Sequence, residues 1–117
     1  MLSEESKVKS NIFSKELNIY IPKSLHNDSQ WPFDGSDIIS KVYFKKGEQK
    51  DVVYIHEIEK DAKFDCIPLI GKMIPYGRGL ENLGLYFPYS DEIPLKKGKI
   101  VSLTIENEEK RLKIHLK

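Results

Sequence analysis

Hydrophobic and polar residues alternate along most of the chain with a period of two, which is typical of half-buried β-strands. β-Branched and aromatic residues occupy many of the apolar positions, as they do in strands. One short helix is expected over Pro22–Asp28, because proline suits the first turn of a helix. We predict strands over residues 17–21, 38–44, 52–55, 85–87, 100–105 and 112–116, with polar turns at 45–48 and 107–109.

The two halves of the chain resemble each other. Residues 18–24 align with residues 84–90, and Tyr, Pro and Ser fall at the same places. Each half then has an apolar face that it cannot bury alone, and closing the sheet removes its exposed edges. We therefore predict a mostly β fold, a small closed pseudo-twofold β-barrel built from two related strand–turn–hairpin halves, with one or two short helices. After a four-residue shortening of the second copy, the alignment continues with 31–33 against 93–95, 38–40 against 100–102, and Val52 against Ile114.

Length and charge limit the remaining possibilities. The chain of 117 residues suits one domain over 1–117, with halves at about 8–60 and 64–117. Residues 1–10 are mostly polar and lack a strong period, so we expect a loosely attached terminus, with residues 1–7 disordered. Nineteen basic and 18 acidic residues give a net charge of +1, so binding to nucleic acid would require a local patch. No apolar run could span a bilayer, and the acidic start is unlike a secretory signal, so a cytoplasmic location without membrane contact is expected.

The order of motifs resembles the AbrB/SpoVT-like swapped-hairpin family of transcription factors. Residues 20–25 carry an apolar strand end followed by Ile-Pro-Lys, and residues 94–101 carry Lys-Lys-Gly before an apolar strand. The resemblance covers about 8–59 and 74–117, and it implies a fused dimer in one chain. Tyr89 replaces the lysine after proline in the second copy, which departs from the family pattern. Double-psi barrels, which also have related halves, remain competitors for the fold.

The resemblance implies a DNA-binding transcription regulator or chromatin-associated factor, acting as a monomer or homodimer on duplex DNA. Basic residues on the first strand and its loop would meet DNA. These positions hold few cations for a type of binding in which phosphate contacts dominate the affinity. Arg78 lies in a Gly-bearing segment, residues 74–80, that suits either phosphate contact or a simple turn between the halves. The nucleic-acid-binding residues implied are Lys7, Lys9, Lys15, Lys23 and Arg78.

An alternative function is a protein-interaction or assembly adaptor, for example within a ribonucleoprotein complex. Trp31, Tyr76 and Tyr89 are aromatic residues beside turns, where an exposed cluster would anchor a protein partner. Core packing is the competing interpretation of the same residues.

No constellation of residues indicates catalysis, a metal or a cofactor. The spacing of His26, His56 and His115 is unlike a metal site, and these residues do not align between the two halves. Cys66 is the single cysteine, so an internal disulfide is excluded and a small buried apolar role is expected. We expect a protein that is not an enzyme.

Overall fold

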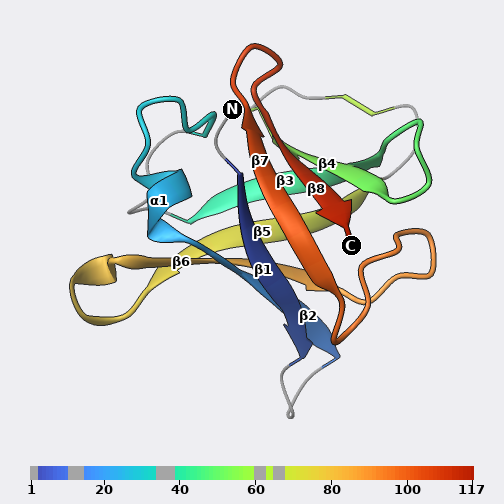
Figure 1. Ribbon diagram of the computed structural model, residues 1–117, viewed down its shortest axis with the longest axis horizontal. Helices are drawn as coiled ribbons and strands as arrows, with labels where there is room; N and C mark the ends of the chain where they lie inside the picture. The colour runs from blue at the N-terminus through green and yellow to red at the C-terminus, as the bar shows by residue number, and fades with distance from the viewer. Residues whose placement is uncertain (1–2, 11–14, 34–38, 60–62, 65–67) are drawn as a thin grey trace.

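The computed structural model describes residues 3–10, 15–33, 39–59, 63–64 and 68–117, which form eight strands and two short helical segments (Figure 1). A single turn of α-helix lies between the second and third strands, and a 3-10 turn lies between the fifth and sixth. The elements are β1 (Ser3–Ser10), β2 (Glu16–Ile21), α1 (Lys23–His26), β3 (Ser40–Lys46), β4 (Val52–Glu57), β5 (Leu69–Tyr76), η1 (Arg78–Leu80), β6 (Asn82–Pro88), β7 (Ile100–Glu106) and β8 (Arg111–Leu116).

The strands close into one barrel in the order β1-β2-β6-β5-β3-β4-β8-β7, and every neighbouring pair is antiparallel. The prediction of a mostly β, closed barrel is therefore confirmed. Each half contributes two hairpins, β1–β2 and β3–β4 or β5–β6 and β7–β8. Hairpins from the two halves alternate around the barrel, so neither half can enclose the core without the other.

The pairing pattern has an approximate twofold symmetry, because it is unchanged when β1–β4 are exchanged with β5–β8. Ile19 and Leu85 pair directly, and the sequence alignment also matches these two positions. In the second hairpin of each half, the symmetry of the barrel matches different residues from those that the sequence alignment matches. The strand pairs made by Val42 in the first half are equivalent to those made by Val101 in the second. The second copy is thus seven residues shorter at this point, not four. The sequence alignment is displaced by three residues here, so it would have matched inward-facing residues of one half with outward-facing residues of the other.

Inward-facing side chains of all eight strands form one core. Because β2 and β6 are antiparallel, the chain leaves them at opposite mouths of the barrel. Leu25 and Phe33 follow β2 and are buried, as are Ile93 and Leu95 after β6. Each half therefore closes one mouth, and residues 31–33 and 93–95, which align in sequence, both supply a buried plug.

Two strands were absent from the sequence prediction. Residues 3–10 form β1, so the expectation of a loosely attached terminus was wrong for residues 3–10, as was that of disorder for residues 3–7. This polar strand is held between β2 and β7, and pairing on both sides compensates for its low strand propensity. β5 contains Gly71 and Pro75, which mask its alternation. Residues 74–76 end β5 and the next residues turn into β6, so segment 74–80 lies within the second half and does not link the halves.

Candidate nucleic-acid interface

The lysines predicted to meet DNA do not share one surface. Lys7 and Lys9 face outward on β1, and Lys15 directly precedes β2. Lys23 follows the other end of β2, where its Nζ lies 3.1 Å from Oε2 of Glu81. The six residues of β2, about 20 Å of extended chain, separate Lys15 from Lys23.

Arg78 belongs to the end of the barrel that carries Lys23. It lies in the tight turn between β5 and β6, three residues before the Glu81 that pairs with Lys23. Gly77 and Gly79 have φ values of 88° and 75°, a left-handed conformation that favours glycine. These glycines therefore serve the hairpin turn.

The three aromatic residues predicted to bind a partner are also dispersed. Trp31 packs against the core, with ring centroids 5.2 Å from Phe33 and 6.4 Å from His26, so the core-packing interpretation holds for it. Tyr76 is exposed at the end of β5 beside the turn. Tyr89 follows β6 at the other end of that hairpin, and its hydroxyl donates a 2.6 Å hydrogen bond to Asp91.

A basic surface that the sequence reading missed covers one side of the barrel. The alternation of side chains along β5, β3, β4 and β8 places four lysines and one arginine at outward positions. No carboxylate occupies an outward position of these four strands. The outward positions of the other four strands hold two lysines and three glutamates. We call the five cations the basic wall: Lys41, Lys45, Lys72, Arg111 and Lys113.

Repulsion between lysines of the basic wall lowers the stability of the barrel. Lys41 and Lys72 lie directly opposite each other on β3 and β5, and like charges in this position are unfavourable. Lys45 and Lys113 flank Tyr54 in the same row across β3, β4 and β8. None of these four lysines makes an ion pair with another residue that the structure describes. Their charges are therefore available to an anionic ligand.

Arg111 is the fixed member of the wall. Its guanidinium carbon lies 3.7 Å from the centre of the Tyr54 ring, and its Nε donates a 2.6 Å hydrogen bond to Glu106. Both members of this ion pair are mostly buried, so the side chain is held more firmly than an exposed pair would hold it. Stacking of a cation on an aromatic face adds about 1 kcal/mol.

Aromatic rings continue the row beside Arg111. His56 is directly opposite Arg111 on β4 and stacks on Tyr43 of β3, with centroids 5.1 Å apart and planes inclined by 13°. Phe64 meets the Tyr43 ring edge-on at 5.0 Å. The outer surface thus carries a column of rings next to the cations, a combination used by proteins that bind nucleic acids.

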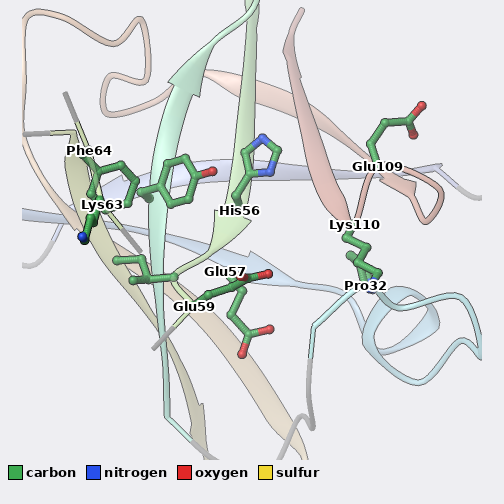
Figure 2. A pocket seen from close by; sticks show the side chains of 10 residues that line it. Pro32, His56, Glu57, Glu59, Lys63, Phe64, Glu109 and Lys110 are labelled. Atoms are coloured by element: carbon green, nitrogen blue, oxygen red, sulfur yellow. The ribbon is translucent and has the colours of Figure 1, made fainter. Parts of the chain in front are cut away.

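Two open recesses lie on this surface. The larger, of about 800 Å³, is lined by the rings of Tyr43, His56 and Phe64. Figure 2 shows Phe64 and Lys63 on one side of it, Pro32 and Lys110 on the other, and the side chains of Glu57 and Glu59 between them. The smaller, of about 470 Å³, is bordered by Tyr54 and by four cations and one acid, which are Lys45, Lys46, Arg111, Lys113 and Glu48.

The structure corrects one conclusion that the sequence alignment gave about the histidines. His56 and His115 occupy equivalent positions of β4 and β8 under the twofold symmetry, whereas the alignment left them unmatched. The described residues contain no group of three or more His, Cys, Asp and Glu side chains placed to hold a metal ion. Cys66 lies outside the described residues.

Two histidines should make the protein sensitive to acid. Burial, and then the charge of Lys23, lower the pKa of His26, and both ring nitrogens of this residue are buried without a hydrogen-bond partner in the described structure. Burial, then Arg111 and Lys45, lower the pKa of His56. The native state therefore binds these protons less readily than the unfolded chain, whose histidines titrate near pH 6.5.

We expect the free energy of unfolding to be insensitive to these two groups above about pH 7 and to fall as the pH drops below about 6.5. Urea titrations between about pH 8 and pH 5 measure this loss. His26→Leu and His56→Gln should each flatten the acid limb. An acid limb unchanged in both variants would assign the loss to other groups.

Neither helical segment in the described part of the chain is long and apolar enough to cross a membrane. Comparison with known protein families, with curated proteins and with solved structures finds no match for this chain.

Proposed function

We propose that this chain is a non-catalytic nucleic-acid-binding protein whose contact surface is the basic wall. The observation that carries the proposal is the separation of charge, because every charged residue at an outward position within β5, β3, β4 and β8 is a cation, and the one carboxylate of these strands, Glu57, has the inward register at the end of β4. Phosphate contacts dominate the affinity of proteins for nucleic acids. A net charge of +1 would not attract a polyanion strongly, but four lysines without an ion-pair partner in the described structure, beside Arg111, form a local concentration of positive charge that does.

The barrel architecture supports a narrower form of the proposal, a DNA-binding regulator of the AbrB/SpoVT type. In that family two chains interleave their hairpins, and here the hairpins of the two halves alternate around one barrel. The wall supports nucleic-acid binding without this resemblance, since it depends only on register and charge.

The test is a fluorescence titration of the full chain with labelled mixed-sequence DNA, both duplex and single-stranded, at two salt concentrations. We expect saturable binding that weakens steeply with salt. Replacing three wall lysines, as Lys41→Gln/Lys45→Gln/Lys113→Gln, should weaken binding at low salt about tenfold or more and reduce the salt slope by roughly two to three.

The matched control removes the same charge from the other side of the barrel. Lys7→Gln/Lys9→Gln/Lys15→Gln replaces three of the cations predicted from sequence, and it should leave affinity and salt slope nearly unchanged. Absence of saturable binding to either form of DNA at low salt would refute the function. A loss of affinity as large in the control as in the wall variant would contradict the assignment of the contact surface to the basic wall and would implicate β1.

A protein-interaction role remains the second candidate because one mouth of the barrel exposes apolar side chains. Ile39, Tyr76 and Leu80 are each more than a third exposed where β3 begins and β5 ends. Tyr76 was among the residues predicted to bind a partner. This function gains support if the titration finds no nucleic-acid binding.

A further inference from the structure

The shape of the wall restricts the form of nucleic acid that it can read. The barrel measures 34 × 34 × 27 Å, whereas the major groove of duplex DNA is about 12 Å wide and admits a single helix or a two-stranded ribbon. Tyr43, His56 and Arg111 sit within strands on the outer barrel wall, not on a projecting element. An intact duplex could therefore offer its phosphates to the lysines while its base edges stayed out of reach.

The ring-lined recess offers a place for an unpaired base. Phe64 remains 40% exposed although it contacts Tyr43, so part of its surface is open to a ligand. Burial and nearby cations lower the pKa of His56, so the ring that stacks on Tyr43 is neutral at pH 7. Neutral rings and an open recess of about 800 Å³ suit a nucleobase, which every nucleotide presents.

The charges of the two recesses orient a nucleotide between them. Glu57, Glu59 and Glu109 line the ring-lined recess together with Lys63 and Lys110, so it disfavours a phosphate. The basic recess begins at Lys45, two residues along β3 from Tyr43, which is about 7 Å of extended strand. A phosphate on Lys45 and Lys113 therefore leaves the adjoining base within reach of the rings.

Resting on the proposed function, we infer that the wall binds single-stranded nucleic acid, with phosphates on Lys45 and Lys113 and an unstacked base against Tyr43 and Phe64. A single strand can follow a convex surface and turn its bases toward it, which a paired duplex cannot do without opening. Site sizes of single-strand-binding domains are about 4–16 nucleotides, so a short segment would cover this wall.

The experiment compares a labelled single-stranded DNA of about 12 nucleotides with the duplex and the RNA of the same sequence, at equal salt. We expect the single strand to bind roughly tenfold more tightly than the duplex. Tyr43→Ala should weaken single-strand binding roughly tenfold and leave duplex binding and the salt slope unchanged. Tyr43→Phe should retain single-strand binding, because the ring is kept.

The matched control is Tyr20→Ala, which removes an outward, half-buried tyrosine from β2 on the other side of the barrel. Tyr20→Ala should leave single-strand affinity unchanged, and thermal unfolding of both alanine variants shows that each is folded. Tighter binding of the RNA than of the DNA strand would place the 2′-hydroxyl in the site and keep the inference. Equal or tighter duplex binding, or equal losses in Tyr43→Ala and Tyr20→Ala, would overturn it while leaving the proposed function standing.

Discussion

Phe87→Ala should lower the free energy of unfolding by about 3–5 kcal/mol, a large part of the 5–15 kcal/mol typical of a domain. Phe87 is 1% exposed on β6, and its ring lies 5.0 Å from that of Phe44 on β3. Its backbone pairs with Leu17 of β2. The side chain therefore joins hairpins from both halves, and its removal leaves a cavity where those hairpins meet.

Urea unfolding followed by circular dichroism measures this loss, and the transition should remain single because the interleaved hairpins share one core. Phe87→Leu is the matched control and should cost only about 1 kcal/mol, since it keeps most of the apolar volume. Equal losses in the two variants would contradict a cavity effect. Two separate transitions would contradict the shared core.

Gly71→Val should destabilise the barrel by about 3 kcal/mol, because β5 has no room for a side chain at this position. A Cβ atom on Gly71 would lie 2.7 Å from the backbone oxygen of Tyr86 and 2.8 Å from Cε1 of Phe44. The ring of Phe44 could turn away, but the oxygen of Tyr86 is held in the pairing of β5 with β6. The strands would have to separate locally.

Two further variants separate these causes in the same urea titration. Lys72→Val changes the next residue, which faces outward, and should not destabilise the barrel, because it places nothing in the interior and removes the repulsion from Lys41. Adding Phe44→Leu to Gly71→Val should recover only part of the loss beyond what Phe44→Leu costs alone, because the clash with the backbone oxygen persists. Complete recovery would show that the ring alone makes the site tight.

The alternation of apolar residues was sufficient to predict most strands, and the similarity of the two halves led to the prediction of the closed barrel. The segments around Ile19, Val53 and Leu103 alternate strongly, and they form β2, β4 and β7. β1 could not be predicted in this way, since residues 3–7 are all polar and only their two neighbouring strands make them a strand. Similarity between the halves identified the symmetry, but the alignment of β3 with β7 was displaced by three residues because the triplet at 38–40 is Ile-Ile-Ser and closely resembles the Ile-Val-Ser of 100–102.

The candidate site was less accessible to sequence reasoning than the fold. The pattern Lys41-Tyr43-Lys45 on alternate positions was a local signal, as was Arg111-Lys113. Their approach to each other depends on β4 lying between β3 and β8, which the chain order does not indicate. The family resemblance pointed instead to Lys7, Lys9, Lys15, Lys23 and Arg78, which the barrel distributes over both of its ends and the other side.

The sequence by itself determined which residues face inward, because side chains along a strand alternate between its two faces and apolar ones must leave water. It also determined that two related halves would combine. The tertiary structure alone decided which strands are neighbours, and with them which outward-facing charges share a surface. Charges meet through space across paired strands, so the basic wall exists only once the hairpins of the two halves have interleaved.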